Sequence, residues 1–164
     1  MQIVIMGGGK IGSNLCQTLS TSENDITLIE QDPVVLERLT SQHDIIGVLG
    51  NGSSYEIQVE AKTPNADVFV AVTANDEINL IACIIAKQLG ADYTIARVRN
   101  PEYASHMEEM RRALGISLML NPDRQAASEI ARLIQFPTAL SVEPFAHNRV
   151  NMVEVEIPAE HELI

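Results

Sequence analysis

The chain of 164 residues is poor in positive charge, with 11 Lys and Arg residues against 22 Asp and Glu residues and a net charge of −11. It has no tryptophan, and aromatic residues make up only 4% of it. Proteins bind DNA and RNA largely through clustered Lys and Arg side chains, so this composition argues against a nucleic-acid partner. It also argues against attraction to an anionic membrane surface.

Long apolar runs and cysteine motifs are missing as well. The longest nearly apolar run, residues 80–86, is far shorter than the ~20 residues that span a bilayer. Met1 leads directly into a strand-like segment, without the basic and apolar regions of a signal peptide. Cys16 and Cys83 lie in predicted helices and form no CxxC motif, which favours buried free thiols in a reducing cytosol. We therefore expect a cytoplasmic protein.

What the sequence does contain is a regular alternation of apolar strand-length segments with helix-patterned segments. Strands are predicted at residues 3–6, 26–30, 45–49, 68–72, 93–98 and 117–120, and helices at residues 10–20, 33–40, 54–61, 75–89, 101–114 and 121–136. The strands are apolar throughout, as strands covered on both faces must be. This pattern predicts an α/β fold, a Rossmann-like doubly wound parallel sheet with helices on both faces.

The alternation ends after Pro137. Two strand segments follow, at residues 139–142 and 152–157, with no helix between them. We therefore predict a Rossmann domain over residues 1–136, and a linker with the start of a truncated C-terminal subdomain over residues 137–164.

Three glycines follow the first strand at informative offsets. Gly7, Gly9 and Gly12 satisfy G-x-G-x-x-G between a strand and a helix, which is the context of a dinucleotide-binding βαβ unit. Gly7 would allow the tight turn, Gly9 would let the backbone approach a pyrophosphate, and Gly12 would let the helix pack against the strand. The N–H groups and the dipole of the helix would then face the phosphates. A glycine-rich turn without a ligand is the alternative.

Polar residues stand at the ends of the next strands, at the edge where such sheets bind ligands. Glu30 ends the second strand, where a carboxylate accepts ribose hydroxyls and repels a 2′-phosphate; a plain surface charge is the alternative. Asn51 follows the third strand, where a plain turn is the alternative. Thr73 with Ala74 follows the fourth, where the cap of the next helix is the alternative. Arg97 lies inside an otherwise apolar strand and needs an anionic ligand or a nearby acid as a partner.

No catalytic set can be recognised. The four histidines, His43, His106, His147 and His161, are scattered, and no Ser or Cys nucleophile is placed with His and Asp at a strand end. No metal-ligand cluster is predicted either. We therefore expect no enzymatic activity, although a small NAD-dependent oxidoreductase, or its cofactor-binding domain, remains the alternative.

Five segments resemble those of the Trk-type potassium uptake regulators, the TrkA family, which carry RCK (KTN) domains. They are MQIVIMGGGKIG, ITLIEQDP, GNGSS, VAVTANDEINLIACIIAKQLGA and IARVRNPEY. The resemblance covers residues 1–136, and the tail from Leu140 resembles the start of the family's C-terminal subdomain. It implies NAD or NADH as the ligand, with ATP or ADP as the alternative.

The same resemblance implies a cytoplasmic regulatory subunit at the inner face of the cell membrane. Its partners would be a membrane potassium transporter or channel subunit and further copies of itself, in a dimer or a higher ring, and it would gate potassium flux by conformational change. The nucleotide-site residues that the motif and the resemblance indicate are Gly7, Gly8, Gly9, Lys10, Ile11, Gly12, Glu30, Asn51, Thr73, Ala74 and Arg97.

The last predicted helix supports the expectation of self-assembly. Ala127, Ile130, Ala131 and Ile134 form one apolar stripe, and Ala126 and Leu133 make it wider than one sheet face needs. An ordinary covering helix is the alternative interpretation.

Overall fold

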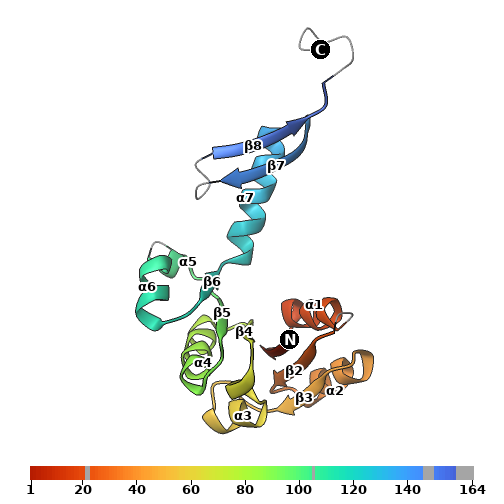
Figure 1. Ribbon diagram of the computed structural model, residues 1–164, viewed down its shortest axis with the longest axis vertical. Coiled ribbons are helices and arrows are strands. Elements are labelled where there is room, and N and C mark those ends of the chain that lie inside the picture. The colour runs from red at the N-terminus through yellow and green to blue at the C-terminus, as the bar shows by residue number, and fades with distance from the viewer. Residues whose placement is uncertain (21–22, 105, 146–149, 158–164) are drawn as a thin grey trace. The chain divides into compact units, whose positions relative to one another are not determined.

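The computed structural model describes residues 1–20, 23–104, 106–145 and 150–157, which form two compact units, Met1–Asn121 and Pro122–Ile164 (Figure 1). The first unit contains β1 (Gln2–Met6), α1 (Lys10–Leu19), β2 (Asp25–Glu30), α2 (Pro33–Gln42), β3 (Ile46–Leu49), α3 (Tyr55–Glu60), η1 (Thr63–Asn65), β4 (Val68–Ala71), α4 (Asp76–Leu89), β5 (Tyr93–Arg97), α5 (Pro101–Ala104), α6 (Met107–Leu114) and β6 (Leu118–Leu120). The second unit contains α7 (Pro122–Gln135), β7 (Ala139–Phe145) and β8 (Val150–Val155).

The six strands of the first unit form one parallel sheet in the order β3-β2-β1-β4-β5-β6. This is the strand order of the doubly wound Rossmann fold, in which the chain reverses direction across the sheet between β1 and β4. The predicted fold class and the six predicted strands are confirmed, with small shifts at their ends.

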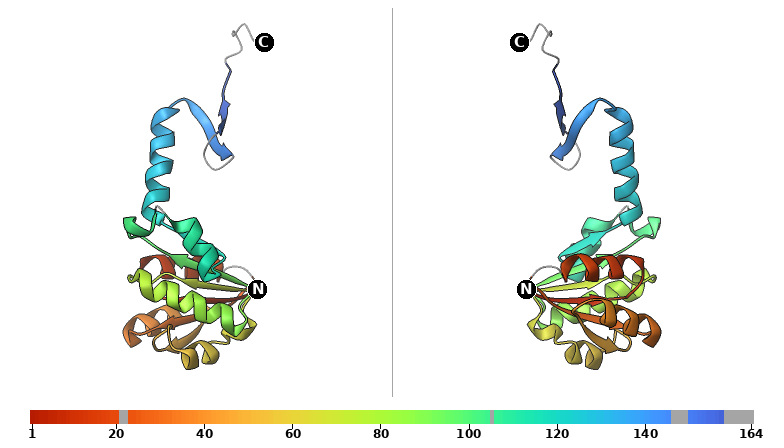
Figure 2. Two further views of the ribbon diagram at one scale, coloured as in Figure 1. Left: turned by 90° about the vertical axis from the view of Figure 1, so that its left-hand side faces the viewer. Right: turned by 90° about the vertical axis from the view of Figure 1, so that its right-hand side faces the viewer.

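Helices cover both faces of this sheet, as the two side views show (Figure 2). Side chains of β1 alternate between the faces, so Ile3 and Ile5 join one buried cluster while Val4 and Met6 join the other. The first cluster includes Cys16 of α1 and Leu39 of α2. The second includes side chains of α4, with Leu80, Ala82, Cys83 and Ala86. Apolar burial on both faces explains why the strands read as continuous apolar runs.

The segment predicted as one helix over residues 101–114 is two helices, α5 and α6, with His106 at the N-cap of α6. Two tight backbone bonds, from Tyr103 N–H to the Asn100 oxygen and from His106 N–H to the Tyr103 oxygen, replace the regular helical pattern there. Tyr103 of α5 and Met107 of α6 are both partly buried and pack against the buried cluster that contains Val4 and Met6.

In the second unit, β7 and β8 form an antiparallel hairpin, and α7 contacts β7. The contacts divide the chain between Asn121 and Pro122, so α7 belongs with the hairpin, whereas the sequence places the domain boundary after Phe136. Helix α7 is grouped with the hairpin because it packs on β7. None of its residues is completely buried.

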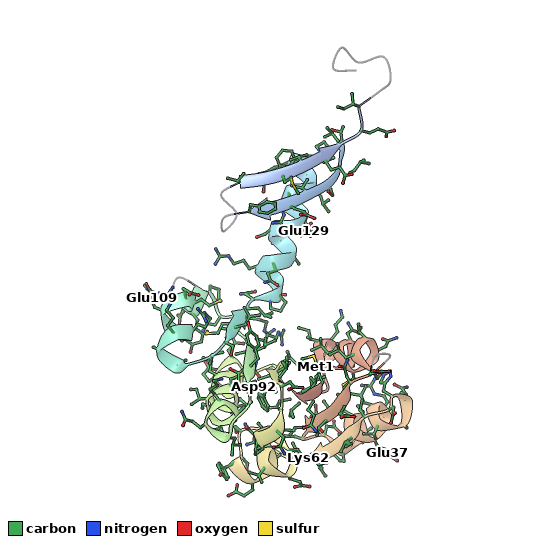
Figure 3. All side chains as sticks on the ribbon, viewed as in Figure 1. Met1, Glu37, Lys62, Asp92, Glu109 and Glu129 are labelled. Carbon is green, nitrogen blue, oxygen red and sulfur yellow. The ribbon has the colours of Figure 1, made fainter. Side chains whose placement is uncertain are left out.

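Charged side chains lie on the outside of the first unit, as Figure 3 shows for Glu37 on α2 and Glu109 on α6. On α6, Glu108 pairs with Arg111 at 2.7 Å and with Arg112 at 3.1 Å. The bond from Arg111 is the main cause that lowers the pKa of Glu108 to about 2. These pairs lie on the solvent-facing side of α6. No described helix is both long and apolar enough to span a bilayer.

Candidate nucleotide-binding site

A cleft of about 540 Å³ lies at the carboxyl ends of the central strands. It is lined by Met6, Gly7, Gly9, Lys10, Ile11, Ile29, Glu30, Gln31, Gly50, Asn51, Gly52, Val72, Thr73, Ala74, Asn75, Ile78, Arg97 and Arg99. The helices that follow β1 and β4 pack on opposite faces of the sheet, which opens a crevice between these two strands. Doubly wound sheets bind ligands at this switch point, and the volume is in the ordinary range of ligand pockets.

In the glycine loop between β1 and α1, the reason for a glycine differs from one position to the next. Gly7 has φ +103, a conformation that favours glycine, and its N–H donates to the Ile29 oxygen at 2.9 Å. A Cβ on Gly8 would lie 2.8 Å from Val35 Cγ1, and a Cβ on Gly12 would overlap the Gly7 carbonyl oxygen. A Cβ on Gly9, in contrast, would meet nothing within 4 Å. Packing therefore explains Gly8 and Gly12, whereas no protein atom explains the small residue at Gly9.

The N-terminus of α1 is open. Asp32 caps α2 by accepting from the Val34 and Val35 N–H groups, and Asn75 caps α4 by accepting from Ile78 N–H. Helix α1 begins after Gly9, with no side-chain cap and no acidic residue in its first turn. Its first N–H groups and the positive end of its dipole are therefore left for an anion that reaches the cleft.

Glu30 at the end of β2 is fixed by three backbone N–H groups. Oε2 accepts from Gly8 at 2.5 Å, and Oε1 accepts from Gln31 at 2.7 Å and from Asp32 at 3.0 Å. These bonds hold the Glu30 carboxyl group beside the glycine loop, where it lines the cleft.

Asn51, which follows β3, and Thr73, which follows β4, are tied into turns. Asn51 Oδ1 accepts from the Ser53 N–H at 3.0 Å and the Ser53 hydroxyl at 2.8 Å. The Thr73 hydroxyl donates to Asn79 Oδ1 at 2.7 Å. Asn79 is fully buried and was not among the predicted site residues; a lone amide within the apolar part of α4 is the signal that marks it.

Arg97 has no acidic partner among the described residues. Its Nη1 donates to the Thr73 carbonyl oxygen at 3.0 Å, and no described group accepts from its buried Nε. Arg99, which also lines the cleft, donates from Nη2 to the Ala74 oxygen at 2.8 Å. Of the two partners expected for Arg97, a nearby acid and an anionic ligand, the described side chains supply no acid.

The lining is therefore positive in a strongly acidic chain. Lys10, Arg97 and Arg99 line the cleft with Glu30 as the one lining carboxylate among the described residues, while the whole chain carries a net charge of −11. A concave site of this kind attracts an anionic small molecule. The described residues form no cluster of His, Cys, Asp or Glu able to hold a metal ion.

The structure places most of the predicted site residues together. Gly7, Gly9, Lys10, Ile11, Glu30, Asn51, Thr73, Ala74 and Arg97 all line the cleft, whereas Gly8 and Gly12 do not. The cysteines lie outside it. Burial raises the pKa of Cys16 to about 11 and that of Cys83 to about 12, so both thiols stay protonated and unreactive near neutral pH.

The fold and this cleft together define a Rossmann-type domain with a glycine loop at its switch point. Comparison with known families identifies the family of this domain, because the TrkA-N domain matches residues 3–122. The chain belongs to the TrkA-N domain family. The match ends close to the boundary between the two compact units.

Among the chain's relatives is the Trk system potassium uptake protein TrkA of Haemophilus influenzae, which is 38% identical over 159 residues. The alignment covers 95% of this chain and 35% of that protein, so the chain spans about a third of that relative's length. That relative is named as a potassium uptake protein and not as an enzyme.

Solved structures show the same fold. The TrkA-N domain of the inner membrane protein ybaL from Escherichia coli has a TM-score of 0.71 and 22% identity, over 81% of this chain and 96% of that one. The GsuK channel bound to NAD has a TM-score of 0.62 and 19% identity, over 74% of this chain and 21% of that one. GsuK bound to ADP has a TM-score of 0.61 and 18% identity, over 73% of this chain and 31% of that one.

Proposed function

We propose that the first unit binds NAD or NADH in the cleft, and that the bound nucleotide regulates a membrane potassium transporter or channel. ADP and ATP are the alternative ligands for the same cleft. The observation that carries the proposal is the open N-terminus of α1, where Gly9 lines the cleft and a Cβ on it would meet nothing within 4 Å. A phosphate group fits such a place because backbone N–H groups and the helix dipole both stabilise negative charge.

The residues of the cleft fit the parts of a dinucleotide. The backbone around Gly9, Lys10 and Ile11 would hold the pyrophosphate, and Glu30 would accept hydrogen bonds from the adenosine ribose hydroxyls. Thr73, Ala74 and Arg97 line the part of the cleft beyond β4, which would take the second half of the ligand. NAD and ADP in the GsuK structures support both ligand classes.

Catalysis is not part of this proposal. Hydride transfer needs a substrate held against the nicotinamide and, in most cases, a positioned proton donor or acceptor. The described lining contains no histidine or cysteine, and its one carboxylate already accepts from three N–H groups. The oxidoreductase alternative therefore gains no support from the described site.

A regulator needs two conformations with different affinities for the ligand. Tenfold discrimination between two states supplies about 1.4 kcal/mol of bias per site, and several sites in one assembly add their contributions. The name of the Haemophilus relative supports potassium uptake as the process that is regulated. We place the protein in the cytoplasm, bound peripherally at the inner face of the membrane through its transporter partner.

Self-assembly forms part of the same proposal. The stripe on α7 is exposed, with 58% of Ile130, 60% of Leu133 and 73% of Ile134 accessible. Apolar side chains at helical spacing with this exposure favour contact with a second copy, which would let ligand binding in one subunit influence its neighbours.

The proposal is tested by calorimetry with NADH, NAD, ADP and ATP against the same preparation of the protein. We expect saturable binding of at least one nucleotide with one site per chain. If none binds, the proposed function is wrong. Reduced-cofactor absorbance with a panel of hydroxy acids, aldehydes and quinones supplies the second arm, in which turnover would favour the oxidoreductase instead.

A further inference from the structure

Asn79 of α4 lies outside the cleft lining, yet its amide group connects two of the lining segments. The residue is 0% exposed. Oδ1 accepts from the Thr73 N–H at 3.0 Å and from the Thr73 hydroxyl at 2.7 Å. Nδ2 donates to the Thr73 oxygen at 3.2 Å and to the Arg97 oxygen at 2.9 Å. An asparagine amide has two donors and two acceptor positions, so every one of them is used.

These bonds continue the connection between β4 and β5 past the point where the sheet stops. The ladder between the two strands ends at the pair Ala71 and Ala96. Beyond it, Thr73 and Arg97 line the cleft without a ladder bond between them, and Asn79 bridges their backbones. Arg97 closes the connection from its own side, because Nη1 donates to the Thr73 oxygen at 3.0 Å.

Asp76, one turn earlier on α4, holds the next part of the same segment. Its Oδ2 accepts from the Arg99 N–H at 2.8 Å and from the Asn100 N–H at 2.7 Å. Arg99 in turn donates to the Ala74 oxygen at 2.8 Å. The start of α4 therefore fixes the turn after β4. It also fixes the segment at and just after the end of β5, which contains Arg97 and Arg99, the two arginines of the cleft.

We propose that Asn79 is a positioning residue of the nucleotide site, which keeps Thr73 and the backbone of Arg97 in the geometry that the ligand meets. This inference rests on the proposed function. Without the amide, the Arg97 oxygen and the Thr73 N–H lose the partner that Asn79 supplies, while the Thr73 oxygen keeps only the bond from Arg97 Nη1. In the free protein the two segments then move to satisfy the lost bonds with water. Binding must then restore the original arrangement, so the loss appears as weaker affinity.

The test compares Asn79→Leu, which removes all four bonds at similar volume, with Thr94→Val. Thr94 is an equally buried residue on β5 whose hydroxyl accepts from the Ser117 N–H at 3.2 Å, away from the cleft. We expect Asn79→Leu to lose at least about tenfold in affinity for NADH and ADP, and Thr94→Val to stay within about twofold of the wild type. Equal affinities in the two variants would overturn the proposal.

A cycle with Arg97→Met separates positioning from general loss of structure. If Asn79 acts through the end of β5, the double variant should bind nucleotide at most about threefold more weakly than the single variant with the lower affinity. Independent, fully multiplying effects would contradict the proposal. Asn79→Asp, which keeps the acceptor oxygen but cannot donate, provides the second variant. If neither Asn79 variant folds while Thr94→Val does, Asn79 is a folding residue and the proposal is wrong.

Amide hydrogen exchange gives a readout that needs no ligand. Asn79→Leu is expected to speed exchange at Thr73 and at residues 97–100, whereas Thr94→Val leaves these amides protected. If the wild type binds no nucleotide, the proposed function fails, and exchange still decides whether Asn79 fixes these segments. Unchanged exchange in Asn79→Leu would overturn the inference even if the wild type binds nucleotide.

Discussion

The largest fully buried apolar side chains all belong to the first compact unit, whereas several large apolar side chains of the second are exposed. Phe69 of β4 is 0% exposed, whereas Ile134 of α7 is 73% exposed. The first unit buries apolar clusters on both faces of its sheet. In the second unit, no described residue of α7 or β8 is fully buried. The first unit therefore contains its own core and the cleft, and the second offers surface that another chain can cover.

The largest expected effect is on the free energy of unfolding, and it should distinguish a buried apolar residue of the first unit from an exposed one of the second. Phe69→Ala should destabilise the protein by about 3–5 kcal/mol because it leaves a cavity in a closed core. Ile134→Ala should change the free energy of unfolding by at most about 0.5 kcal/mol in the isolated chain. Urea unfolding measures both. Similar losses in the two variants would mean that α7 belongs to a core like that of the first unit.

The next prediction concerns what covers α7. If a second copy covers the exposed stripe, Ile134→Asp should reduce the mass in light scattering to that of a monomer, because a carboxylate in an apolar interface is costly to bury. The melting temperature of the first unit should stay the same. A monomeric mass for the wild type at high micromolar concentration would contradict self-assembly of this chain.

Within the first unit, the Glu30 carboxylate in the cleft should determine the preference for NADH over NADPH, which surface carboxylates should not affect. A 2′-phosphate beside Glu30 should cost about 1–3 kcal/mol, so NADH should bind about tenfold to a hundredfold more tightly than NADPH. Glu30→Gln should narrow this ratio. The measurement is calorimetry with both cofactors, and equal affinities for the wild type would remove Glu30 from the site.

The smallest effect is expected at Glu108, which is on the surface of α6. Its pKa is lowered from 4.5 to about 2, so its pairs stabilise the fold above pH 4.5 and this contribution is lost as the pH falls through about 2. Glu108→Gln should therefore lower the melting temperature slightly at pH 7 and not at all near pH 2. A difference that grows as the pH falls would contradict this assignment.

The parts of the fold that follow from local pattern could be predicted from the sequence. Continuous apolar strands separated by helices specify the parallel sheet, and the offsets of Gly7, Gly9 and Gly12 place the loop that follows β1. The Asp32 N-cap of α2 was also predictable, because an Asp before a Pro at the first helical position is a local signal.

The parts that depend on distant contacts could not be predicted. Asn79 bonds to Arg97, 18 residues further along the chain, and the sequence around Asn79 alone reveals only one amide among apolar residues. The separate roles of Gly8 and Gly9 depend on α2, because Val35 blocks one position and leaves the other open. The break between α5 and α6 was not predicted either, and Tyr103 and Met107, on its two sides, both pack against the distant residues of the sheet's buried cluster.

The central claim is that a nucleotide phosphate lies against the backbone at Gly9, and substitution at this position tests it most directly. A Cβ there would meet no protein atom within 4 Å, and the φ of −67 suits any residue, so the domain should stay folded. We expect Gly9→Ala to weaken NADH and ADP binding, and Gly9→Val to abolish it, while both variants keep the melting temperature of the wild type. Undiminished nucleotide binding by a well-folded Gly9→Val protein would contradict the account.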